Sequence, residues 1–237
     1  MDSIADRIWF SQLEAVALQE VCRKQLVAIQ DRLDEYQDGK YKIHFGYSRT
    51  IGTTQCDTYG TGVITLHYSE PNRYDLPSPS SGEQRINSCI TTMMWGQPVR
   101  ACSTHLSYNG EPFGYEYRQD QIAHVRTYCA GQGGYRAILQ MGDFNAPSPS
   151  SEMSPLTSLL GEVDDTANAH NTYAWTYTHT DTGPYTKFDY ISYGRYYLGN
   201  TVNYNIVATK YGPGLPDEAT ENDFDHQSLL STRMYVR

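Results

Sequence analysis

Four short segments of this chain place polar or ionisable side chains where a buried strand pattern ends. They are Leu18-Gln19-Glu20-Val21, Ser103-Thr104-His105-Leu106, Gly142-Asp143-Phe144-Asn145 and Asp225-His226. Side chains alternate along a strand, so Asp143 and Asn145 are expected on the same side of a sheet. A carboxylate and a carboxamide placed together could hold a hard metal ion or an anionic oxygen. Four such endings in one chain predict an active site at the edge of a sheet.

The elements that must position these segments are mainly strands. Apolar alternation predicts strands over residues 15–18, 41–47, 60–68, 86–94, 99–106, 135–141, 173–177, 187–193, 202–208 and 228–236. Helical spacing of apolar residues predicts helices over residues 2–12, 22–33, 115–130 and 154–160. The 21 tyrosines, with frequent Thr, Ser and Gly, also favour sheet over long helices. Because no boundary or repeat stands out, we expect one α+β domain, residues 1–237.

Composition restricts the classes of partner. The 237 residues carry a formal net charge of −9, unlike a typical basic nucleic-acid coat. A polyanionic substrate must therefore meet a local basic patch or a bound cation. The candidate cations are Arg85, Arg118, Arg126 and Lys187. No segment approaches the roughly 20 apolar residues that a membrane span needs, so we expect no membrane-spanning segment. We also expect the protein to be a monomer.

The five cysteines form no CxxC pair, which argues against a zinc ribbon. Cys89 and Cys102 flank a predicted hairpin turn and would lie nearly opposite each other. Cys22 and Cys56 would then form the second disulfide and leave Cys129 free. Five reduced, buried thiols are the open alternative.

Disulfides and a low lysine content favour an extracellular setting. Residues 1–20 nevertheless lack the basic, apolar and small-residue pattern of a signal peptide. We therefore expect either a secreted protein whose signal is absent from this chain or a protein that is not secreted.

Five segments, in order, resemble the endonuclease/exonuclease/phosphatase superfamily, which includes deoxyribonuclease I, abasic-site endonucleases, sphingomyelinases, inositol-polyphosphate phosphatases and the B subunit of cytolethal distending toxin. They are Leu18-Gln19-Glu20-Val21, Ser103-Thr104-His105-Leu106, Gly142-Asp143-Phe144-Asn145, Lys187-Phe188-Asp189-Tyr190-Ile191 and Asp223-Phe224-Asp225-His226. The resemblance implies a four-layered α/β/β/α sandwich of the deoxyribonuclease I type. Its active site would lie where the loops of the two sheets meet.

Phosphodiesters resist hydrolysis because an anion repels its nucleophile and the leaving alkoxide is poor. A divalent cation answers both difficulties, and Mg²⁺ takes carboxylate ligands. The resemblance implies Glu20 and Asp225 as metal ligands, with Mg²⁺ as the expected ion and Ca²⁺ or Mn²⁺ as alternatives. A surface Glu at a strand end is the structural alternative for Glu20.

The resemblance also implies the acid–base groups. His226 would activate water, since imidazole titrates near neutral pH, and Asp189 would orient its other ring nitrogen. Asp143 and Asn145 would position the nucleophile and hold the scissile phosphate.

A second imidazole, His105, matches the residue that binds the phosphate or protonates the leaving oxygen in the deoxyribonuclease branch. Glu83 occupies the place of the Glu that steers it, and Arg85 could bind a phosphate oxygen. A surface ion pair between Glu83 and Arg85 is the alternative. The remaining histidines match no family motif and are interpreted as structural: His44, His67, His124, His170 and His179.

Family members open with a strand that bears an Asn contacting the metal or phosphate. This chain begins at the following helix, with Met1 only 19 residues before Glu20. We therefore expect the first strand to be missing and the stability to be lower than that of a version extended upstream.

Three functions remain open from the sequence. The first is a Mg²⁺-dependent phosphodiesterase, a deoxyribonuclease I-like endonuclease acting on DNA. The second is a sphingomyelinase- or inositol-phosphatase-like phosphoesterase, and the third is a catalytically impaired binding module. The loops at 68–82, 108–116 and 209–224 would set the substrate, and their composition names no ligand.

Overall fold

The computed structural model describes residues 2–50, 56, 58–66, 69–80, 82–94, 96–131, 134–135, 137–146, 150–162, 189–194, 203–210 and 228–235. The helices are α1 (Asp2–Phe10), α2 (Arg23–Tyr36), α3 (Gly114–Ala130) and α4 (Ser154–Thr157). The strands are β1 (Ala15–Cys22), β2 (Tyr41–Thr50), β3 (Thr58–Leu66), β4 (Ser69–Asp75), β5 (Ile86–Met94), β6 (Gln97–His105), β7 (Ala137–Asp143), β8 (Leu160–Glu162), β9 (Asp189–Gly194), β10 (Asn203–Lys210) and β11 (Ser228–Tyr235). The predicted α+β class is confirmed.

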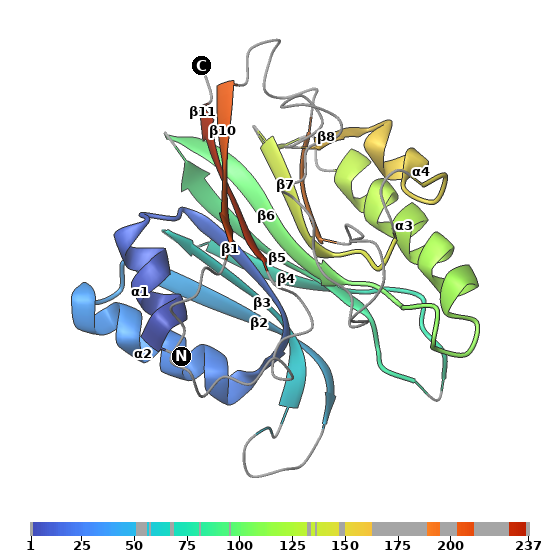
Figure 1. Cartoon of the computed structure of the whole chain (residues 1–237), viewed down its shortest axis with the longest axis horizontal. Coiled ribbons are helices and arrows are strands. Elements are labelled where there is room, and N and C mark those ends of the chain that lie inside the picture. Colours follow the sequence, from blue (N-terminus) through green and yellow to red (C-terminus); the bar gives the residue numbers. More distant parts are fainter. Residues whose placement is uncertain are drawn as a thin grey trace.

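The first three strands form a three-stranded antiparallel sheet with strand order β1-β3-β2. Helices α1 and α2 cover one face of this sheet (Figure 1). Their apolar stripes, represented by Ile8, Leu26 and Leu33, are buried against Val16 of β1 and Ile64 of β3. The spacing of three and four residues between the buried positions of α2 is the reason that this segment folds as an amphipathic helix.

A six-stranded sheet has the order β4-β5-β6-β7-β9-β8, in which only β6 and β7 run parallel among the described ladders. Helices α3 and α4 lie on its outer face (Figure 1). Its inner face packs on the three-stranded sheet, because Val63 of β3 shares one buried cluster with Ile90, Ala101 and Leu139. The described elements therefore stack as helices, sheet, sheet and helices.

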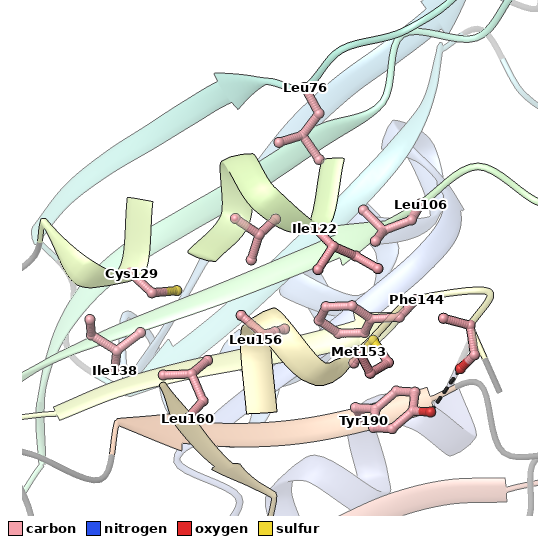
Figure 2. Packing of buried hydrophobic residues seen from close by; sticks show 12 residues of the cluster. Leu76, Leu106, Ile122, Cys129, Ile138, Phe144, Met153, Leu156, Leu160 and Tyr190 are labelled. Atoms are coloured by element: carbon pink, nitrogen blue, oxygen red, sulfur yellow. Dashed lines mark hydrogen bonds between the residues drawn. The ribbon is translucent and has the colours of Figure 1, made fainter. Parts of the chain in front are cut away.

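The outer face of the large sheet holds a second apolar core, shown in Figure 2. Ile122 of α3 and Leu156 of α4 pack there with Phe144, which directly follows β7. Phe144 and Tyr190 of β9 make an edge-to-face contact, with ring centroids 5.5 Å apart. The Tyr190 hydroxyl donates a 2.7 Å hydrogen bond to the carbonyl of Ala146. This core therefore fixes the path of the chain as it leaves β7.

Strands β5 and β6 are buried along almost their whole length, although they carry many polar residues. Those polar groups are paired inside the protein. The amides of Asn87 and Gln140 exchange hydrogen bonds of 3.2 and 3.0 Å, and the Thr61 hydroxyl donates to Ser88 at 2.9 Å. A strand covered on both faces loses the polar–apolar alternation that marks a half-exposed strand.

Disulfides join Cys22 to Cys56 and Cys89 to Cys102, while Cys129 is a buried free thiol. The predicted pairing is confirmed, and the alternative of five reduced thiols is not the state of this structure.

Two edge strands, β4 and β8, were not predicted, and β4 occupies part of the segment 68–82 that was expected to be a loop. The predicted strand 173–177 and loop 211–224 lie outside the described residues, as do His67, His170 and His179. Among the described helices, none combines the length and apolar character needed to cross a membrane.

Candidate active site

The parallel pairing of β6 and β7 places His105 directly beside Asp143. The Nε2 atom of His105 lies 3.6 Å from Oδ2 of Asp143, and both side chains are largely buried. Close approach of the two strands depends on Gly142, where φ is +137°. A Cβ atom at this position would collide with the carbonyl oxygen of Thr104, so only glycine fits.

Glu20 approaches His105 from the three-stranded sheet. A β-bulge between Leu18 and Val21 interrupts the pairing of β1 with β3, and Glu20 takes a left-handed φ of 54° within it. Its Oε1 lies 3.9 Å from Nε2 of His105, and 54% of its side chain is exposed. The predicted strand thus continues past Glu20 to Cys22, with the bulge turning the carboxylate toward His105.

Hydrogen bonds join the two sheets next to this bulge. The Gln19 amide donates to the Ser103 hydroxyl at 2.9 Å, and that hydroxyl donates to the carbonyl of Leu18 at 3.2 Å. Gln19 precedes Glu20, and Ser103 lies two residues before His105. These bonds therefore set the distance between the carboxylate of one sheet and the imidazole of the other.

Asn145 is placed by a different mechanism from the predicted one. Strand β7 ends at Asp143, and Asn145 has a left-handed φ of 49°, so strand alternation does not apply. Its backbone N–H donates to Oδ1 of Asp143 at 2.7 Å, and its side-chain amide donates to the carbonyl of Leu106 at 2.9 Å. Asp143 and Asn145 are neighbours, as expected, but through a turn that also ties β7 to the residue after His105.

Arg85 lies on the Nδ1 side of the His105 ring, with only 2% of its side chain exposed. Its Nη1 is 3.0 Å from Nδ1 of His105 and 3.7 Å from Oε1 of Glu83. Its Nη2 donates to Oε1 of Glu111. Glu83, predicted to steer the imidazole, is therefore linked to it through Arg85, and the predicted surface ion pair is instead buried.

Two further residues belong to this site and were missed by the sequence analysis. Burial raises the pKa of the half-buried Tyr59 phenol, and the neighbouring Glu20 carboxylate adds to this shift. Glu111 lies in the loop between His105 and α3. The disulfide from Cys22 to Cys56 was the available signal for Tyr59, because it ties the segment after Glu20 to the segment before Tyr59.

Helix α3 holds the chain that follows His105. Gln121 Oε1 accepts the backbone N–H of Ser107 at 2.9 Å, and Arg118 Nη1 donates to the Ser107 carbonyl at 3.1 Å. Arg118 is buried and makes a two-pronged ion pair with Glu152. Arg85 and Arg118, two of the four candidate cations, are therefore buried and paired with carboxylates.

The remaining predicted residues are described in part. Asp189, at the start of β9, is the register partner of Asp143, so its backbone lies at the same end of the sheet. Asp225, His226 and Lys187 lie outside the described residues.

The fold family implies a divalent cation. Among the residues that the structure describes, no group of three or more His, Cys, Asp or Glu side chains could hold a metal. Mg²⁺, however, commonly keeps several waters and binds through one or two carboxylates. The exposed Glu20 carboxylate, which like that of Asp143 lies within 4 Å of Nε2 of His105, offers such a hard oxygen ligand, so this part of the site fits the ion.

Comparison with known structures finds other proteins with the same fold. An endonuclease/exonuclease/phosphatase family protein from Leptotrichia buccalis superposes with a TM-score of 0.70 at 19% identity, covering 99% of this chain and 92% of that chain. The human nocturnin catalytic domain gives 0.68 at 18% identity, covering 98% and 85%. D. rerio TDP2, complexed with single-strand DNA product, gives 0.65 at 16% identity, covering 88% and 82%. At these identities the likeness shows the fold, which is that of deoxyribonuclease I.

Comparison with curated proteins gives no match. The sequence match to a family is direct, however, and it extends over residues 5–195, which include Glu20, His105, Asp143 and Asp189. The chain belongs to the Endonuclease/Exonuclease/phosphatase family.

Proposed function

We propose that this protein is a divalent-metal-dependent phosphodiester hydrolase, an endonuclease of the deoxyribonuclease I type. The family consists of phosphoester hydrolases, which gives the reaction class. The observation that carries the proposal is the meeting of His105 with Asp143, at 3.6 Å, and with Glu20, at 3.9 Å, across the two sheets. An imidazole between two carboxylates supplies a hydrogen-bond donor for phosphate next to a ligand for a cation.

The proposed reaction divides these groups by role. A cation held by Glu20 and Asp225, with Mg²⁺ as the expected ion, would neutralise the phosphate charge and stabilise the leaving oxygen. His226 takes a proton from water, oriented by Asp189, while the water oxygen bonds to phosphorus. The bond from phosphorus to the leaving oxygen breaks, and that oxygen gains a proton. Asn145 lies beside Asp143 and holds the phosphate.

Nucleic acid is the proposed substrate class. Three aromatic side chains, Tyr108, Phe113 and Tyr115, are exposed between His105 and the first turn of α3. Phe113 is 72% exposed and has a left-handed φ of 58°. Exposed aromatic rings stack on unpaired bases, these three follow His105 in the chain, and D. rerio TDP2 with its single-strand DNA product has the same fold. Both features support a substrate with accessible bases.

An oxidising compartment is the proposed setting, because two disulfides are formed and one of them is in the core. Secretion is the simplest source of that environment.

The test is cleavage of supercoiled plasmid and of single-stranded DNA with Mg²⁺, with a chelator control. Folded wild-type protein should nick the plasmid, and His105→Ala and His226→Ala should each abolish most of the nicking. The matched control is His124→Ala, which replaces an exposed histidine on α3. Metal-dependent hydrolysis of a lipid or small phosphoester, with DNA left intact, would replace the nuclease by the alternative phosphoesterase. No hydrolysis of any substrate would favour the binding module.

A further inference from the structure

The guanidinium of Arg85 is an unusual neighbour for an active-site imidazole, because both carry N–H groups. Nη1 approaches Nδ1 of His105 to 3.0 Å, and Arg85 is buried with 2% of its side chain exposed. Its charge is balanced by the carboxylates of Glu111 and Glu83, which are themselves largely buried. A buried charge that is paired and hydrogen-bonded in this way is fixed in place.

The chemistry of the two groups decides where the imidazole carries its proton. A guanidinium has five N–H donors, no acceptor, and does not lose its proton in proteins. Nδ1 of His105 must therefore accept the hydrogen bond from Arg85. A proton on Nδ1 would set two donors against each other at 3.0 Å. The proton of a neutral imidazole is then on Nε2, the atom that faces Asp143 and Glu20.

We infer that Arg85 is a positioning residue that holds His105 as the neutral tautomer with its proton on Nε2. In this state His105 binds a phosphoryl oxygen through the Nε2 proton and does not donate that proton to the leaving oxygen. Loss of the proton would leave an imidazolate anion, so His105 keeps it through the reaction. The leaving oxygen then takes its proton from solvent water. The phosphate-binding part of this inference rests on the proposed function.

Arg85 can hold the tautomer because its planar fork contacts two partners at once. One nitrogen meets His105, and the other binds Glu111 of the loop that follows β6. A lysine has a single ammonium on a flexible stem and cannot reproduce this two-sided contact. Glu111 therefore acts on His105 through Arg85.

The tautomer is measured directly, without any substrate, by ¹⁵N–¹H correlation spectra of protein labelled at histidine. His105→Gln assigns the signals. We expect the wild-type His105 spectrum at neutral pH to show an unprotonated Nδ1 and a protonated Nε2. Arg85→Met should shift His105 toward the Nδ1-protonated tautomer or the doubly protonated form. The control Arg126→Met, which removes an exposed arginine from α3, should leave the spectrum unchanged.

Two results would overturn the inference: a protonated Nδ1 in the wild type, or an unchanged His105 spectrum in Arg85→Met. Because that variant leaves Glu111 without its cation, Arg85→Met/Glu111→Gln is prepared beside it. The wild-type spectrum decides the tautomer even where neither variant folds.

The role of His105 is tested with two phosphodiesters that differ only in leaving group, p-nitrophenol and a simple alcohol. His105→Ala should slow both by the same factor, roughly 10²–10³-fold for a lost phosphate-oxygen donor. A much smaller loss for p-nitrophenol, which leaves without help from an acid, would show proton donation by His105. Failure to hydrolyse either ester, together with failure to cleave DNA, would refute the proposed function and leave the tautomer measurement standing.

Discussion

The disulfide between Cys22 and Cys56 should stabilise the N-terminal sheet and the site together. It closes a loop with a sequence separation of 34, running from the end of β1 to the segment just before β3. A cross-link of this span removes chain entropy from the unfolded state worth about 3.8 kcal/mol at 25 °C. Native domains are stable by about 5–15 kcal/mol, so the loss would be a large fraction of the total. Cys22→Ala/Cys56→Ala should therefore lower the free energy of unfolding by about 3–4 kcal/mol.

Urea unfolding of the oxidised wild type and of the double variant measures this difference. The free energy of unfolding of each protein is its midpoint urea concentration multiplied by the slope of free energy against urea. The second disulfide supplies an internal comparison. Cys89 and Cys102 have no exposed area, whereas Cys56 is half-buried. A mild reductant should therefore open Cys22–Cys56 first, and alkylation followed by peptide mapping identifies which thiols appear.

Loss of this disulfide should also have a local effect on the site. Cys22 lies two residues after Glu20, and Cys56 lies three residues before Tyr59, which contacts that carboxylate. The folded double variant should nick plasmid more slowly than wild type at the same fraction folded. An unfolding free energy within about 0.5 kcal/mol of wild type, or reduction of Cys89–Cys102 before Cys22–Cys56, would refute the account.

Two other predictions concern the core beside the site. Gly142→Ala should lower the free energy of unfolding in urea by about 2–4 kcal/mol, because φ is +137° and the added Cβ meets the backbone of Thr104. An unchanged unfolding midpoint would contradict the tight contact between β6 and β7. Burial raises the pKa of the Cys129 thiol from its ordinary 9.0 to about 12, so the folded state holds this proton where the unfolded state has lost it. Stability from this group is complete below pH 9 and falls as pH rises toward 12, by up to about 1.4 kcal/mol per pH unit. Cys129→Val should flatten that slope in unfolding measured from pH 8 to 10.5, and equal slopes for both proteins would count against the buried thiol.

Much of the fold could be predicted because its signals are local. Helix α2 is amphipathic, the β5–β6 hairpin has an evident turn, and Cys89 and Cys102 face each other as its register requires. Strand β4 was missed for a physical reason. It lies at the edge of its sheet, contains Pro71, and shifts register between Ser69 and Asn72. A proline and a bulge are tolerated at an edge, but both weaken the sequence pattern of a strand.

The residues of the candidate site could be predicted from the sequence better than the contacts between them. Glu20, His105 and Asp143 end strands or strand-like runs, and the fold does bring them together. The roles of Arg85 and Glu111 could not be read from the chain, because their contact joins residues 26 apart through loops with no periodic pattern. A motif indicates which residues take part, whereas the partner of each ring nitrogen depends on tertiary packing.

The backbone is irregular where the site residues are presented. Glu20, Asn145 and Gly142 all have positive φ, in a bulge, after a strand and at the end of a strand respectively. A regular strand sends successive side chains to opposite faces, so Glu20, which follows the inward-facing Gln19, would point away from the other sheet without the bulge. A non-glycine residue in this region costs on the order of 1–3 kcal/mol, which the surrounding bonds must offset. The hydrogen bonds of Gln19 with Ser103, and of Asn145 with Leu106, do so on either side of His105. The strained backbone and the hydrogen bonds that stabilise it therefore act together to position the carboxylates around His105.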